Sequence, residues 1–347
     1  MTPNTSPSAS ASPACPTPPA VPASARSSTS STSPSPASRH SDAATAPRRR
    51  LAWLVGLLSG ALLIGNTLLC FLLIVPLALI KLVLPMTAVR RLVDPWLNGI
   101  ATYWVSCNTR WIAFLQPRSW DIEGNTGLQR DDWYLVNCNH QSWVDIFVLQ
   151  RALNKRIPLL KFFLKQQLLY VPVIGLAWWA LDFPFLKRYS KTQLRKNPAL
   201  ARRDLDTARR ACQKFSLVPT SVMVFAEGTR LTEAKRVSQC SPYRHLLKPR
   251  AGALAMTLNA MGGRFRSMVD ATIVYPDGVP SFWDLACGRT GRIIVRIHQA
   301  PIPADFCTAD YAGDKAFRSA FHKWLADQWD AKDAEIARLM TDDRATS

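Results

Sequence analysis

The longest hydrophobic run in the chain lies in its N-terminal third. No residue between Leu51 and Ile80 is charged. At ~1.5 Å per residue, one helix of this length would measure about 45 Å, whereas the hydrocarbon core of a bilayer is roughly 30 Å thick. Gly65 and Pro76 lie within the run, so we expect the helix to tilt, kink or re-enter. Basic residues flank the run on both sides, and the positive-inside rule therefore leaves spanning and re-entrant topologies open.

A second helix is predicted over residues 94–116. Asp94 is suited to cap this helix and Pro95 to occupy its first position. Tryptophan, tyrosine and aliphatic residues then recur at helical spacing. Such a pattern fits either the membrane–water interface or a protein core, and both interpretations stay open. With the preceding run, it predicts a membrane-associated helical segment over residues 51–117.

From residue 118 onward the pattern changes to short apolar runs separated by helix-period stretches. The predicted strands are "WYLVNC", "DFPFL", "SVMVFA", "VDATIVY" and "GRIIVRI". The predicted helices cover residues 143–153, 159–170, 199–214, 251–261 and, near the C-terminus, 315–340. Strands that alternate with helices favour an α/β fold. We therefore predict a layered sheet with flanking helices over residues 118–347, preceded by the N-terminal membrane-associated helices.

Composition separates residues 1–50 from the rest of the chain. They are almost entirely Ser, Pro, Ala and Thr, and their basic cluster stands at the end, directly before the apolar run. A secretory signal has charge first, then a short apolar core and then small residues, an order that this segment lacks. Because the segment has too little apolar surface to offset the entropy lost on ordering, we expect a disordered tail.

The charge balance indicates an anionic partner. The chain has 43 Lys+Arg against 24 Asp+Glu. Next to an apolar anchor, anionic lipid becomes the leading partner. Residues 187–214 are especially basic, which is typical of a solvated helix face but also fits docking to anionic lipid or an acidic carrier protein. No nucleic-acid module is recognisable, so no nucleic-acid partner is expected. The eight cysteines are widely spaced, which predicts free thiols and no metal site.

The stretch "VNCNHQSWVD" places His140 between a predicted strand and a predicted helix. An imidazole can take a proton from a hydroxyl near neutral pH, and Asp145 could fix its tautomer and stabilise the imidazolium. On a continuous helix, residues five apart would point about 140° away from each other. The turn is what could bring the two side chains together. Alternatively, Ser142 and Asp145 form a capping box and the histidine only occupies the turn.

A second polar turn follows the apolar strand "SVMVF". Here Gly228 permits close backbone approach, Thr229 offers a hydroxyl, and Arg230 can hold a phosphate through two parallel hydrogen bonds. Backbone N–H groups at such a turn would add to an anion site. The alternative for Arg230 is a surface ion pair with Glu227.

Together the two turns resemble the glycerolipid acyltransferase family, typified by lysophosphatidic acid acyltransferases. The resemblance covers roughly residues 50–300 and is particularly close to the YihG-type bacterial inner-membrane subgroup. The segment "VPVIGLAWWALDFPFLKRYS" looks like the family's variable second block, with Arg188 on its arginine. Residues of the NHxxxxD block are Asn139, His140, Ser142 and Asp145; those of the FPEGTR block are Phe225, Glu227, Gly228, Thr229 and Arg230, with Ala226 in place of proline.

This resemblance implies a membrane-bound O-acyltransferase of phospholipid synthesis or remodelling. His140 and Asp145 would be catalytic, and Arg188 with Glu227, Gly228, Thr229 and Arg230 would bind the acceptor's phosphate. The acceptor would be 1-acyl-glycerol-3-phosphate or a related lysophospholipid. The co-substrate would be a thioester of coenzyme A or acyl carrier protein, with no bound cofactor and no metal. The resemblance places the catalytic domain on the cytoplasmic face of a bacterial inner membrane.

Two alternatives to this function stay open. The same residues could act on a different lyso-lipid acceptor or transfer acyl groups without a thioester donor. A non-catalytic membrane protein that binds anionic lipid is the other possibility. Lipid binding alone would need neither the histidine–aspartate pair nor the second turn, and their joint presence disfavours it.

Overall fold

The apolar runs after residue 118 form most of the strands of one mixed sheet. In the computed structural model, the strand order is β1–β8–β7–β2–β6–β3; β7 and β8 pair antiparallel, and the other neighbours pair parallel. The strands are β1 (Trp120–Glu123), β2 (Tyr134–Cys138), β3 (Leu160–Phe162), β6 (Ser221–Phe225), β7 (Ser267–Val274) and β8 (Ile293–Ala300). The structure describes residues 39–117, 119–187, 218–308 and 313–346, with a few single positions between them.

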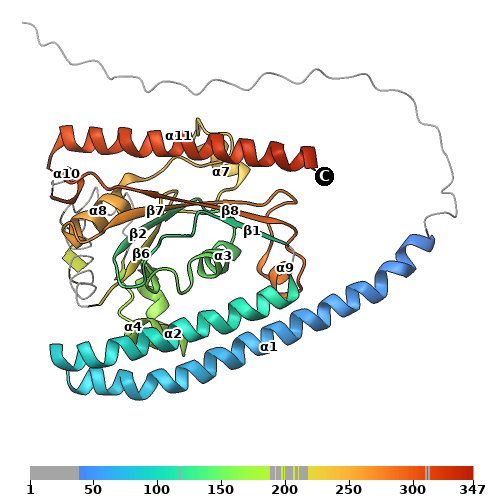
Figure 1. Ribbon diagram of the computed structural model, residues 1–347, viewed down its shortest axis with the longest axis horizontal. Helices are drawn as coiled ribbons and strands as arrows, with labels where there is room; N and C mark the ends of the chain where they lie inside the picture. Colours follow the sequence, from blue (N-terminus) through green and yellow to red (C-terminus); the bar gives the residue numbers. More distant parts are fainter. Residues whose placement is uncertain are drawn as a thin grey trace, which may run out of the picture. The chain divides into compact units, whose positions relative to one another are not determined.

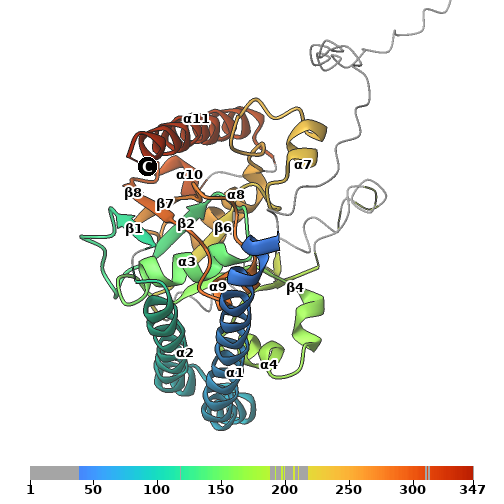
Figure 2. The ribbon, with the colours of Figure 1, turned by 90° about the vertical axis from the view of Figure 1, so that its right-hand side faces the viewer.

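Both faces of the sheet are covered, so its central strands are buried throughout. On β2, Leu135 packs into a core with α8 and α11, whereas Tyr134 and Val136 point to the other face and pack with α3. Figures 1 and 2 show the resulting layers, with α11 on one side of the sheet and α3, α2 and α1 on the other. This alternation is the period-two pattern of a strand between two apolar layers.

The helices and the remaining short elements complete the fold. Contacts within residues 48–347 hold them together as one unit. In chain order they are α1 (Arg39–Val83), α2 (Thr87–Leu115), α3 (Val144–Leu153), β4 (Leu164–Lys165), the 3₁₀ helix η2 (Gln166–Tyr170), α4 (Ile174–Ala180), β5 (Phe185–Leu186), α7 (Glu233–Ser238), α8 (Ala251–Met261), α9 (Phe282–Ala286), α10 (Asp305–Thr308) and α11 (Lys315–Thr346).

The predicted fold class is therefore confirmed. The sheet is an α/β layer with flanking helices, and the predicted strands at β2, β6, β7 and β8 all form, as do the predicted helices at α3, α8 and α11. The element ends differ from the prediction by a few residues, because helices and strands fray at their ends.

The N-terminal apolar run forms a single helix, α1, which is continuous through Gly65 and Pro76. Over Leu51–Val83 it is long and apolar enough to cross a membrane, and no other helix in the described part of the chain is. Helix α1 begins at Arg39, within the segment expected to be disordered, and residues 1–38 lie outside the described residues. The predicted domain boundaries at residues 50 and 117 stay predictions.

The predicted start of the second helix is wrong. Helix α2 begins at Thr87, and Pro95 lies inside it. Asp94 is not a cap; its carboxylate is buried against the Lys81 ammonium of α1 at 2.8 Å. The ion pair joins two segments that turn back on each other, a contact that local spacing could not reveal.

The segment 159–170 is also corrected, because it contains β3, β4 and η2 in place of the predicted helix. Short apolar runs do not distinguish a strand from a helix, and here pairing of β3 with β6 decides the outcome. The predicted strand at 182–186 is reduced to β5, which pairs with β4 in a separate two-stranded sheet. Strand β1 was not predicted. The predicted helix at 199–214 lies largely outside the described residues.

Candidate active site

The turn between β2 and α3 is fixed to the neighbouring strand β7. The Asn139 side chain donates to the Ile273 carbonyl and accepts from the Ile273 N–H, both at 2.9 Å. Asn139 is fully buried, so these two bonds satisfy its amide. They hold the backbone of the next residue, His140, at the carboxyl end of the central strand.

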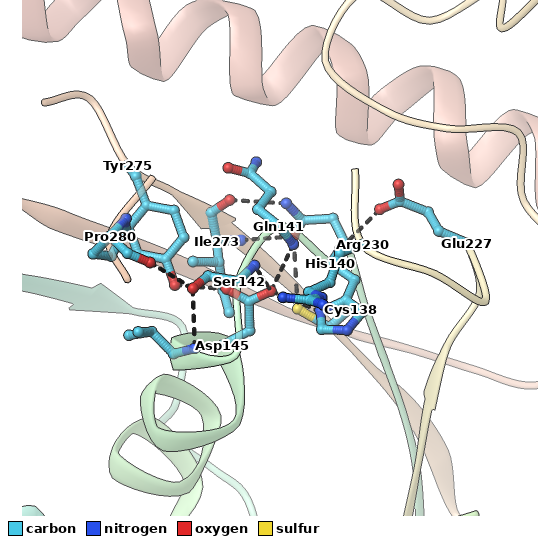
Figure 3. A network of polar contacts seen from close by, with 12 residues as sticks. Cys138, His140, Gln141, Ser142, Asp145, Glu227, Arg230, Ile273, Tyr275 and Pro280 are labelled. Atoms are coloured by element: carbon cyan, nitrogen blue, oxygen red, sulfur yellow. Dashed lines mark hydrogen bonds and ion pairs between the residues drawn. The ribbon is translucent and has the colours of Figure 1, made fainter. Parts of the chain in front are cut away.

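The structure brings His140 and Asp145 together as the spacing suggested. Their side chains meet at 2.9 Å between Nδ1 and Oδ2 (Figure 3). The imidazole also stacks on Phe225, the last residue of β6, with ring centroids 3.8 Å apart and planes 13° apart. Among the described residues, His140 Nε2 has no hydrogen-bond partner. The aspartate and the aromatic ring therefore fix the plane of the imidazole and leave one nitrogen open.

Asp145 is the centre of the hydrogen-bond network in Figure 3. Its Oδ2 also accepts from the N–H groups of Gln141 at 2.6 Å and Ser142 at 2.9 Å. Its Oδ1 accepts from the Tyr275 hydroxyl at 2.6 Å. Burial raises the pKa of Tyr275 well above its ordinary value, with the Asp145 charge adding to the rise, so this hydroxyl stays a donor. Both oxygens of the carboxylate are therefore held in place by hydrogen bonds.

The capping box forms only in half. The Asp145 carboxylate accepts from the Ser142 N–H, but the Ser142 hydroxyl accepts from Val144 at 3.2 Å and donates to the Pro280 carbonyl at 2.6 Å. The carboxylate thus forms hydrogen bonds with the backbone of the turn and with the imidazole at the same time. Sequence reasoning missed Tyr275. Its position directly after an apolar strand, which it shares with the two recognised turns, could have marked it as a site residue.

The second turn is hydrogen-bonded to the first. Glu227 is fully buried, and its carboxylate accepts from the N–H groups of His140 at 2.8 Å and Leu247 at 3.0 Å. The Leu231 N–H donates back to the His140 carbonyl at 2.7 Å. Burial raises the pKa of Glu227 to about 7, although the two N–H donors oppose the rise. Glu227 thus ties the two turns together, which no local pattern predicted.

Cationic groups surround the tip of the second turn. The Arg230 guanidinium lies 4.9 Å from the centre of the Trp143 ring and is exposed. Lys235 donates to the Thr229 hydroxyl at 2.8 Å. Gly228 has φ of +70°, and a Cβ there would lie 3.2 Å from Cδ of a third cation, Arg250. Lys235 and Arg250 were not predicted as site residues.

The alternative for Arg230, a surface pair with Glu227, is wrong. The Glu227 carboxylate is buried and bonded to backbone donors, whereas Arg230 is exposed over an aromatic ring. No carboxylate in the described part of the chain holds the guanidinium, so its donors are available to an anion. The remaining predicted binding residue, Arg188, lies outside the described residues.

Other chemistries find little support near the two turns. Cys138 ends β2, but it is buried, and burial raises the pKa of its thiol well above the ordinary value. A buried neutral thiol is a poor nucleophile. In the part of the chain that the structure describes, no three His, Cys, Asp or Glu side chains are grouped so that they could hold a metal ion.

The comparisons with known proteins agree with this geometry. Residues 119–277 match the Acyltransferase family. That segment contains both turns. The curated relatives are named as 1-acyl-sn-glycerol-3-phosphate acyltransferases. The 1-acyl-sn-glycerol-3-phosphate acyltransferase 2 of Arabidopsis thaliana is 27% identical over 226 residues, which cover 60% of this chain and 52% of the relative. The gamma form from Mus musculus is 26% identical, over 50% of this chain and 48% of the relative.

The chain spans about half the length of the curated relatives that it matches. Among solved structures, the 1-acyl-sn-glycerophosphate (LPA) acyltransferase PlsC from Thermotoga maritima aligns with a TM-score of 0.47 and 17% sequence identity. The alignment covers 85% of this chain and 98% of that chain.

Proposed function

We propose that the protein is an O-acyltransferase that esterifies the free hydroxyl of 1-acyl-glycerol-3-phosphate or a related lysophospholipid. The observation that carries the proposal is the His140–Asp145 contact, with one imidazole nitrogen open beside an exposed cationic turn. An oriented base next to an anion site matches an acceptor that has a hydroxyl and a phosphate. The curated relatives support the same acceptor by their names.

In the proposed reaction His140 is the general base. In this reaction Asp145 accepts a hydrogen bond from Nδ1–H, so the neutral imidazole presents Nε2 as an acceptor. Nε2 takes the proton of the acceptor's hydroxyl while the hydroxyl oxygen attacks the thioester carbonyl carbon. The carbon–sulfur bond then breaks, and the thiolate receives the proton from Nε2. Asp145 stabilises the imidazolium that forms between these steps.

The second turn would hold the acceptor's phosphate. Arg230 offers a planar pair of donors, and Lys235 and Arg250 add positive charge at the same turn. Arg188 belongs to the proposed site through the family resemblance alone. Glu227 would act as a positioning residue, because its carboxylate is bonded to the backbone of both turns. Thr229 and Gly228 would present the turn's backbone to the anion.

The donor and the setting are part of the same proposal. The donor would be an acyl thioester of coenzyme A or acyl carrier protein. Helix α1 would attach the protein to a membrane, in line with its length and composition. The family resemblance further suggests the cytoplasmic face of a bacterial inner membrane and the YihG-type subgroup. Lysophospholipid from the membrane and thioester from the cytosol would then meet at the carboxyl ends of β2 and β6.

The test is thiol release from an acyl thioester by the purified protein in the presence of different lyso-acceptors. Replacing His140 with alanine should lower turnover by ~10²–10⁴-fold, the usual contribution of general-base catalysis. The matched control is His298→Ala, because His298 also contacts a carboxylate, Glu335, at 2.7 Å but is largely exposed and far from both turns in sequence. Wild-type turnover in His140→Ala, or equal losses in both variants, would overturn the catalytic role.

A further inference from the structure

The segment η2–α4 exposes apolar side chains that its own fold does not cover. Residues 166–181 include no charged residue. Four of them point outward, and we call them the α4 patch: Tyr170 is 77% exposed, Val171 39%, Ile174 39% and Leu176 42%. Exposed apolar residues that occur singly need no explanation, but a group of neighbours marks an interaction surface.

The other face of the same segment is held against the N-terminal helices. Ala180 and Leu181 are buried in one apolar cluster with Ile74 of α1 and Leu97 of α2. The Lys81 ammonium of α1 donates to the Ala180 carbonyl at 2.9 Å and pairs with the carboxylate of the residue after this segment, Asp182. The segment therefore cannot rotate to bury the α4 patch without breaking a buried ion pair.

The backbone between η2 and α4 also fixes the direction of the patch. Val173 has φ of +66°, which is unfavourable for a β-branched residue. At Gly175 a Cβ would lie 2.2 Å from the Leu169 carbonyl oxygen, so only glycine allows this close approach. Strain of this kind persists where the surrounding structure imposes it.

The α4 patch is continuous with the exposed end of the helical pair α1–α2. Lys81 bonds to α4, and the residues directly after it are exposed and apolar: Leu82 58%, Val83 72% and Leu84 45%. Both views show α4 beside the turn between α1 and α2 (Figures 1 and 2). Lys165 and Lys187, on either side of the segment, are exposed. An apolar surface bordered by lysines suits a lipid leaflet with anionic headgroups.

We propose that the α4 patch inserts into the same membrane leaflet that receives the end of the α1–α2 pair. The membrane contact of the protein then includes residues 170–176, which follow Lys81 of α1 by 89 to 95 positions along the chain. Insertion here fixes the tilt of the α/β domain on the bilayer, because two segments of the chain, the end of the α1–α2 pair and the α4 patch, then contact the membrane. The proposal concerns attachment and stands apart from the catalytic role of His140.

A fluorescent label tests the proposal in the full-length protein. Cysteine is introduced at Leu176 (Leu176→Cys) or Ile174 (Ile174→Cys), labelled with an NBD group, and measured in vesicles of phosphatidylcholine and phosphatidylglycerol. The exposed native Cys240 is replaced by serine, and the labelled background without the new cysteine is subtracted. Far-UV circular dichroism checks that each variant folds. Val237→Cys on α7 is the matched control, since Val237 is 63% exposed and α7 lies beside α11 (Figure 1).

Labels at Leu176 and Ile174 should show blue-shifted emission, lose quenching by aqueous iodide, and be quenched by doxyl-labelled phosphatidylcholine. The Val237 label should show the opposite pattern. The labels should show the same fluorescence pattern when His140 is also replaced by alanine. That result would show that membrane attachment does not depend on acyl transfer. Iodide quenching of the Leu176 and Ile174 labels equal to that at Val237 would overturn the proposal. Protection from iodide without doxyl quenching would also overturn it, because a second protein copy would then cover the patch.

Discussion

The substitution Asp145→Asn removes the negative charge of the carboxylate and keeps the size and shape of the side chain. In the native site, Oδ2 accepts from His140, Gln141 and Ser142, and Oδ1 accepts from the Tyr275 hydroxyl. An amide nitrogen cannot accept a hydrogen bond, so it can take only the position of Oδ1. There the tyrosine hydroxyl can rotate and become the acceptor. The amide oxygen then keeps the other three donors, and the turn keeps its geometry.

The expected effects on stability and turnover have different causes. A hydrogen bond to a charged group contributes ~1.5–3 kcal/mol and a neutral one ~0.5–1.5 kcal/mol, a difference of about 1–1.5 kcal/mol per bond. Weakening all four bonds should therefore lower the free energy of unfolding by up to about 4–6 kcal/mol. Turnover should fall by ~10²–10⁴-fold, because no negative charge stabilises the imidazolium of His140 in the transition state. An interaction present only in the transition state lowers kcat and kcat/KM together.

The measurements are thiol release from the acyl thioester and chemical unfolding in detergent micelles. Tyr275→Phe is the companion variant, since it removes one hydrogen bond and keeps the Asp145 charge. Its turnover should stay within about tenfold of the native value, in line with a net hydrogen-bond contribution near ~1 kcal/mol. If Asp145→Asn lost stability but turned over at the native rate, the carboxylate would support only the turn, and the catalytic argument would be refuted.

Three further outcomes follow from individual contacts. Arg230→Lys should raise the KM for lysophosphatidic acid about tenfold and leave the donor's KM unchanged, because lysine loses both the paired donors and the stacking on Trp143. A rise in the donor's KM alone would show that Arg230 binds a phosphate of the donor. Burial raises the pKa of Glu227 from 4.5 to about 7, so between these pH values the folded state keeps a proton that the unfolded state loses. The free energy of unfolding should therefore fall by up to about 3 kcal/mol as pH rises from 4.5 to 7. Glu227→Gln should remove that slope, and parallel stability curves for the two proteins would contradict the assignment. Asp270→Ala should cost about 3–5 kcal/mol in chemical unfolding, because it leaves the buried Lys332 ammonium without its carboxylate at 2.9 Å; if adding Lys332→Met did not restore most of the loss, the ion pair would not be its cause.

Tertiary contacts explain why parts of the sequence prediction were wrong. Residues 159–170 have the apolar spacing of a helix, yet strand β3 forms within them because β6 offers an edge with which it can pair. Asp94 has the sequence context of a cap, yet it pairs with Lys81 across the α1–α2 turn. In both cases a partner distant in sequence outweighed a local preference of about 1 kcal/mol.

The sequence by itself determined strands β2, β6, β7 and β8, the long apolar helix, and the two polar turns at the ends of β2 and β6. These depend on periodicity, chain length and residue chemistry, all of which are local properties. Only the tertiary structure decided how the turns meet: Glu227 bonds the backbone of His140, Phe225 stacks on its ring, and Tyr275, the residue directly after β7, bonds Asp145. Parallel strands place residues far apart in sequence at one sheet edge, and strand order is set by the packing of whole layers. For that reason the residues of each turn could be named from the sequence, whereas the network that orients them could not.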